Sequence, residues 1–91
     1  MKVLVLDTET TGLDLTRHEL IQIGFYCIQL NEDNSYEILR EREISIKPMH
    51  METADQRALI VNGYSERKWS GTKPISEHFE EICDWIHSAD I

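Results

Sequence analysis

Apolar and polar positions divide the first half of the chain into three strand-like segments. Residues 3–6 are apolar without interruption, which is typical of a strand buried on both faces, so we expect a central rather than an edge position. In residues 20–30 the odd positions from Ile21 to Cys27 are apolar, whereas the positions between them, Gln22, Gly24 and Tyr26, are small or polar. This alternation predicts a long strand with one buried face.

A third strand is predicted over residues 36–46, with Ile38, Ile44 and Ile46 on one side. Mixed charges in its middle favour a solvent-facing or edge position. Residues 31–35 are rich in turn formers and link this segment to the preceding one. We therefore predict that the second and third strands form an antiparallel hairpin.

The second half of the chain has helical periodicity. Residues 52–61 predict a short helix that is capped near Thr53 and ends at Asn62-Gly63. Residues 64–73 are loop-like, and residues 74–87 carry the clearest helical signal. The apolar residues of that last helix are spaced to form a single stripe, made of Ile75, Phe79, Ile82, Cys83 and Ile86.

Composition favours a single small globular domain. The 91 residues are 41% hydrophobic and 29% charged, which is too apolar for a disordered chain. We expect no membrane segment and no signal peptide, and hence a cytoplasmic protein. Cys27 and Cys83 are expected to be buried thiols rather than a disulfide, and Trp69 and Trp85 to be packing residues.

A net charge of −8 argues against a high-affinity, non-specific nucleic-acid-binding module, because phosphate contacts dominate the affinity of such proteins. It does not exclude an enzyme that holds a short strand end through metal ions. Three basic residues, Arg67, Lys68 and Lys73, also lie close together and can form a local basic rim.

Two acidic residues stand where the first strand gives way to a Thr/Gly turn. Asp7 and Glu9 are two positions apart, so an extended backbone projects both to the same side. Neighbouring carboxylates repel each other unless a cation or a proton lies between them, and Mg²⁺ prefers such oxygen ligands. The pair therefore predicts metal-dependent phosphate chemistry, with two solvated acids at a strand end as the alternative.

Two blocks of the sequence resemble the DEDDh 3′–5′ exonucleases, which include the proofreading subunit of bacterial DNA polymerase III, ribonuclease T and oligoribonuclease. The first block is Asp7-Thr8-Glu9-Thr10-Thr11-Gly12-Leu13 followed by His18-Glu19-Leu20-Ile21-Gln22-Ile23-Gly24. The second comprises Ile46-Lys47-Pro48, the segment Ala54 to Val61, Asn62-Gly63-Tyr64 and Trp69. A D-x-E pair alone is a weak signal, but its combination with both blocks is specific.

The resemblance implies a fold similar to ribonuclease H and hydrolysis of DNA or RNA from a single-stranded 3′ end. It also implies a site with two Mg²⁺ or Mn²⁺ ions. By position, Asp7 and Glu9 match the first two of the family's four acidic ligands. The positions that match contacts to the 3′-terminal nucleotide are Thr10, Gly12 and Leu13, and Asn62 matches a region that lines the nucleotide pocket. Leu13 has core packing as an equal alternative.

The family's remaining motifs have no counterpart in residues 75–91. Asp84 is predicted on the solvent-exposed face of a helix, and Asp90 lies next to the last residue. His78 and His87 are both predicted on that same helix. We therefore expect residues 1–91 to form a single partial exonuclease-like domain. Its fold would be a truncated α/β, ribonuclease H-like one, with three mostly antiparallel strands followed by two helices, and it would have little or no activity alone.

The rival hypothesis is a non-catalytic interaction protein. A sheet with missing strands leaves unpaired backbone groups, which are a template for strand addition. Such an edge would bind a second copy of the chain or a partner chain. A split nuclease, in which a partner chain supplies the missing ligands, combines both hypotheses.

Overall fold

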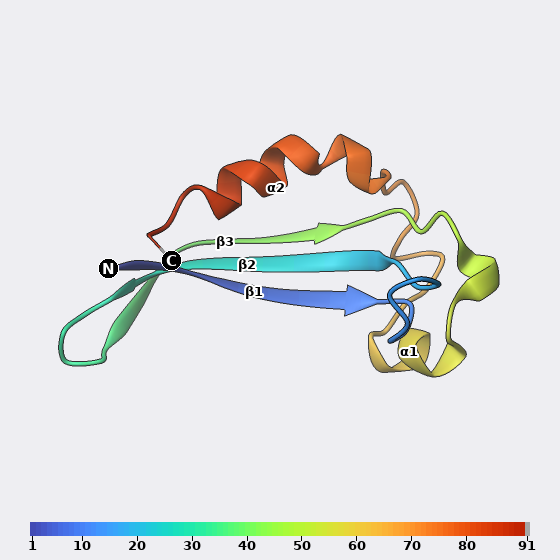
Figure 1. Ribbon diagram of the computed structural model, residues 1–91, viewed down its shortest axis with the longest axis horizontal. Coiled ribbons are helices and arrows are strands. Elements are labelled where there is room, and N and C mark those ends of the chain that lie inside the picture. Colours follow the sequence, from blue (N-terminus) through green and yellow to red (C-terminus); the bar gives the residue numbers. More distant parts are fainter. Residues whose placement is uncertain (91) are drawn as a thin grey trace.

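The computed structural model describes residues 1–90. A three-stranded antiparallel sheet is built from β1 (Lys2–Thr10), β2 (Leu20–Leu30) and β3 (Tyr36–Ser45), in the spatial order β1-β2-β3. Helix α2 (Phe79–Ile86) runs along one face of the sheet, and the shorter α1 (Gln56–Val61) lies near the end where β1 stops (Figure 1). The predicted α/β arrangement, three antiparallel strands followed by two helices, is confirmed.

The core lies between β2 and α2. The four odd positions of β2 that the alternation singled out are all buried. Phe25 is fully buried and stacks on Trp85 of α2, with ring centroids 5.3 Å apart. A second cluster, formed by Ile21, Leu59 and Trp69, joins the sheet to α1. Both tryptophans are therefore packing residues, as predicted. Cys27 and Cys83 are free thiols, but only Cys27 is buried as predicted, whereas Cys83 is half-buried.

The prediction that residues 3–6 form a central strand was wrong. β1 extends further, to Thr10, and among residues 1–90 it is an edge strand while β2 is central. Val5 and Leu6 are 44% and 52% exposed. Among residues 1–90, only Lys2 at the start of the outer edge has a hydrogen-bonding partner there: Asp90 bonds both its main-chain N–H and its carbonyl. An uninterrupted apolar run therefore does not by itself place a strand in the middle of a sheet.

The predicted hairpin of the second and third strands is confirmed, but, contrary to the prediction, Ile38 does not lie on the same side of the sheet as Ile44 and Ile46. The link between β2 and β3 is closed by Asn31 and Ser35, and Asn34 adopts a positive φ of 67°. The register of the pair shifts between Cys27 and Ile28. Because one extra residue reverses the side to which later side chains point, Ile38 leaves the face that holds Ile44 and Ile46.

The helix predicted over residues 52–61 is two elements. A 3-10 turn covers Met51–Thr53, and α1 begins after Asp55, whose side chain accepts a hydrogen bond from the Arg57 amide. Thr53 is not the cap, because its hydroxyl donates to backbone carbonyls elsewhere. The predicted stop is confirmed, since Asn62 caps α1 and Gly63 adopts a positive φ of 72°.

The helix predicted over residues 74–87 is also divided, into a 3-10 turn at Ile75–Glu77 and α2. Its apolar stripe is only partly the packing face. Ile82 of the stripe packs against the core together with Trp85, which lies outside the stripe, whereas Phe79 is 64% exposed. The large Trp85 ring stacks on Phe25 and thereby turns the stripe partly away from the core. No helix within residues 1–90 is long and apolar enough to cross a membrane.

Candidate active site

The structure brings Asp7 and Glu9 to one face of the sheet. Asp7 pairs with Gly24, and Glu9 pairs with Gln22. These four residues lie on the face opposite α2, because the odd positions of β2 point toward that helix. Asp7 is exposed and Glu9 is half-buried. The prediction that the two acids project together is therefore confirmed.

Neither carboxylate has a hydrogen-bond or ion-pair partner among residues 1–90. The nearby hydrogen bonds join their neighbours instead, such as Thr10 to Gly12 and Gln22 to Glu43. Two negative side chains with all their oxygen lone pairs free are suited to hold a divalent cation, which usually takes one or two protein carboxylates and keeps several waters. Within the described part of the chain, no group of three or more potential ligands is assembled around them. The residues present thus fit part of a metal site.

Further negative charge lies on the same face, one strand beyond β2. Glu43 of β3 pairs with Gly24, so Asp7, Gly24 and Glu43 form one row across the sheet. The Gln22 side-chain amide donates to Glu43 Oε1 over 2.9 Å and holds that carboxylate in place. The face that carries Asp7 is therefore acidic, which favours a cation over a free anion.

The turn after β1 is tightly packed. The Thr10 hydroxyl donates to the carbonyl of Gly12 over 2.6 Å. A Cβ built on Gly12 would overlap the His18 ring, so any larger residue there requires that ring to move. Leu13, by contrast, is 98% exposed, which excludes the core-packing alternative for its side chain within residues 1–90.

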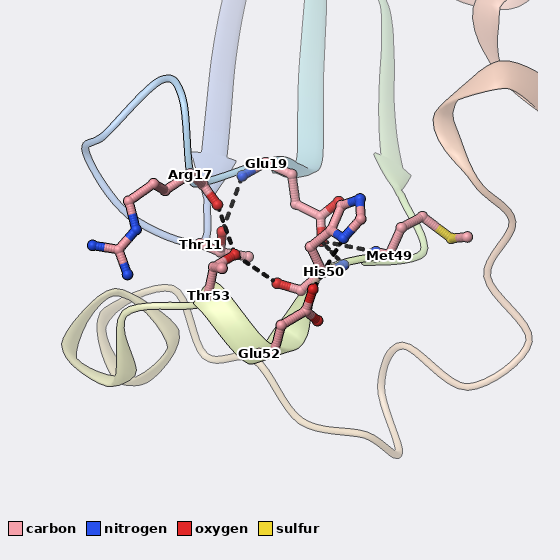
Figure 2. A network of polar contacts seen from close by, with 7 residues as sticks. All are labelled: Thr11, Arg17, Glu19, Met49, His50, Glu52 and Thr53. Atoms are coloured by element: carbon pink, nitrogen blue, oxygen red, sulfur yellow. Dashed lines mark hydrogen bonds and ion pairs between the residues drawn. The ribbon is translucent and has the colours of Figure 1, made fainter.

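A polar network that the sequence did not reveal holds this turn. Thr11 is fully buried: its amide donates to the carbonyl of Glu19 over 2.9 Å, and its hydroxyl accepts from the Glu19 amide over 3.0 Å. The Glu19 carboxylate then accepts from the amides of Met49 and His50, as Figure 2 shows. The start of β2 is thus joined both to the turn and to the segment that leaves β3.

The same network reaches α1. The Thr53 hydroxyl donates to the carbonyls of Arg17 and His50 (Figure 2). The Asp55 amide donates to the carbonyl of Thr11 over 2.7 Å. The pKa of the Glu52 carboxyl is lowered, first by its own backbone N–H and then by His50. In the sequence, the only feature that pointed to this polar network was the position of Thr11 and Glu19 on either side of the loop between two predicted strands.

Asn62 lies beside the end of β1. Its side-chain amide donates to the carbonyl of Thr10 over 2.9 Å, and its side-chain oxygen accepts from the amide of Tyr64. A hollow of about 460 Å³ adjoins it, lined by Gln22, Glu43, Ser45, Asn62, Gly63, Lys68 and Trp69. The structure therefore gives Asn62 a structural role at the border of the acidic face.

The late acidic and histidine side chains are not brought to Asp7. Asp84 belongs to α2, on the other side of the sheet. The His87 ring contacts the carbonyl of Cys83, and Asp90 binds the backbone of Lys2 at the far end of β1. None of these groups completes the site around Asp7 and Glu9.

A family model described as an exonuclease (RNase_T) matches residues 4–91. The matched range includes Asp7, Glu9, the turn that follows them and Asn62. No curated protein matches the chain.

Proposed function

This chain belongs to the exonuclease family, and we propose that Asp7 and Glu9 are metal ligands of a 3′–5′ exonuclease site. The resemblance to the N-terminal portion of DEDDh exonucleases is confirmed by the family match. The observation that carries the proposal is that both carboxylates lie on one open, acidic sheet face with no partner among residues 1–90.

A bound Mg²⁺ or Mn²⁺ ion would polarise a phosphodiester and lower the pKa of a water molecule. The chain's own residues would position that ion and the substrate end. Asp7 and Glu9 would hold the ion, and the turn at Thr10, Gly12 and Leu13 would contact the terminal nucleotide of DNA or RNA. The exposed Leu13 side chain supports this role, because it is free to pack against a base. Asn62 would fix the edge of the nucleotide pocket through its bond to Thr10.

We further propose that residues 1–90 alone have little or no activity. They contribute two carboxylates, whereas the family's two-metal site uses four acidic ligands. Loss of ligands removes both charge and geometry, so we expect weak metal binding. Groups from outside these residues would have to complete the site.

A 3′-exonuclease assay tests this function. Wild type and the Asp7→Ala/Glu9→Ala double variant are purified in parallel and incubated with 5′-labelled single-stranded DNA and RNA in Mg²⁺ or Mn²⁺. We expect no difference between the two proteins for the isolated chain. A ladder of shortened products from wild type alone would overturn the proposed inactivity while supporting the site.

A second candidate function, binding to a partner, is favoured by the outer edge of β1. Hydrogen-bonding directions alternate along a strand, and Lys2 points outward to Asp90, so the main-chain groups of Leu4, Leu6 and Thr8 also point outward. On the face opposite α2, a hollow of about 260 Å³ is lined by apolar side chains, namely Val5, Tyr26, Ile28, Tyr36 and Ile38. Light scattering tests association: a clean monomer counts against pairing with a second copy, whereas a dimer supports it.

A further inference from the structure

Gly24 has no conformational or packing reason to be glycine. It lies in the middle of β2, and the glycines with positive φ are Gly63 and Gly71. A Cβ built on Gly24 would meet only the backbone oxygen of Asp7, at 3.9 Å, which is an ordinary van der Waals contact. Glycine within a strand weakens that strand, and it often marks a place where a ligand approaches the backbone closely.

The missing side chain leaves a gap beside Asp7. Gly24 pairs with Asp7 on one side and with Glu43 on the other, so these carboxylates flank it on the open face. The next β2 residues on this face, Gln22 and Tyr26, carry long side chains. On the β3 side of Gly24 lies a hollow of about 320 Å³, lined by residues of β2 and β3 alone, namely Gly24, Phe25, Tyr26, Glu41, Arg42 and Glu43.

We propose that Gly24 is a positioning residue whose bare backbone makes room for the hydrated divalent cation held by Asp7 and Glu9. This inference rests on the proposed function. Mg²⁺ and Mn²⁺ bound to one or two carboxylates keep several water molecules, and those waters need space next to the ligand. A side chain at position 24 would occupy that space. Glu43, held by Gln22 Nε2 at 2.9 Å, faces the same gap and can accept a hydrogen bond from a metal-bound water.

Mn²⁺ titration, followed by the loss of the free-ion electron paramagnetic resonance signal, tests the inference. The variants are Gly24→Ala and Gly24→Val, with thermal unfolding recorded in parallel. We expect Gly24→Val to lower the Mn²⁺ affinity by roughly tenfold or more and Gly24→Ala to lower it less. The reason is that the larger valine side chain would occupy more of the space that the metal-bound water molecules need. We also expect an unchanged or higher melting temperature, since both residues favour a strand more than glycine does. The smaller alanine keeps the test valid where valine disturbs the fold.

The matched control is Ile28→Val, on the same strand and face but four residues from Gly24, which leaves the Mn²⁺ affinity unchanged. Equal Mn²⁺ affinity in wild type and both Gly24 variants overturns the inference and leaves the proposed function standing. Absence of binding by wild type, or equal binding by Asp7→Asn, overturns the proposed function and the inference together.

Discussion

The side-chain amide of Asn62 donates a hydrogen bond to the backbone carbonyl of Thr10, although the two residues are 52 positions apart. This bond joins the end of α1 to the end of β1. It lies next to the register shift between Glu9 and Thr10, where the pairing with β2 becomes irregular. The position of the Glu9 backbone therefore depends on a residue from the other half of the chain.

We predict that Asn62→Ala lowers the free energy of unfolding by about 1–2 kcal/mol, because it removes the partner of a half-buried carbonyl. Urea denaturation measures the change. Asn62→Asp is the informative companion, since it retains the acceptor for the Tyr64 amide but loses the donor to Thr10. Wild-type stability in both variants would mean that the bond to Thr10 does not hold the strand end.

Gly12→Ala tests the packing of the turn. The added methyl group would overlap the His18 ring, and overpacking of this kind costs about 1–3 kcal/mol. In a double-mutant cycle with His18→Ala, we expect part of the loss to be recovered, because removal of the ring makes room for the methyl group. Strictly additive costs of the two substitutions would contradict the proposed clash.

Thr11→Val retains the shape of a fully buried side chain but removes the hydroxyl that accepts from the Glu19 amide. We expect a loss of about 1–2 kcal/mol, since a half-buried N–H is left without its partner. Thr11→Ser is the control, because it restores the hydroxyl and forfeits only a methyl group. Chemical denaturation of the three proteins gives the comparison, and a valine variant as stable as wild type would refute the role of the hydroxyl.

The Arg42–Glu81 pair gives a small pH dependence. The hydrogen bond from Arg42 lowers the pKa of Glu81, so this pair contributes stability above the unfolded-state pKa of a glutamate. That contribution is lost as pH falls through the lowered, folded-state pKa. The side chains are 48% and 40% exposed, which limits the effect to less than about 1 kcal/mol. Melting temperatures of wild type and Glu81→Gln should therefore differ slightly at pH 7 and converge in acid.

Local patterns predicted the parts of the fold that depend on neighbouring residues. The period-2 alternation of β2 gave its buried face, and the polar link gave the hairpin. The edge position of β1 and the outward turn of Phe79 depend on which elements pack together, and no local pattern contains that information. The register shift at Cys27 has no clear signal in the sequence either.

The same distinction holds for the site. Asp7 and Glu9 were predicted to share a face because strand periodicity alone determines it. The support around them was not predictable, since Glu19 bonds to amides 30 and 31 residues away. The open space above Gly24 likewise appears only when β1, β2 and β3 are aligned in register.

Binding of Mn²⁺ mapped residue by residue tests the central claim most directly. Paramagnetic broadening of backbone amide signals is recorded for wild type and for Asp7→Asn/Glu9→Gln, which removes both charges with little change in shape. The account predicts that broadening centres on residues 7–9 and on the paired residues 22–24 of β2, and that it disappears in the double variant. Broadening that centres elsewhere, or that persists unchanged in the double variant, would contradict it.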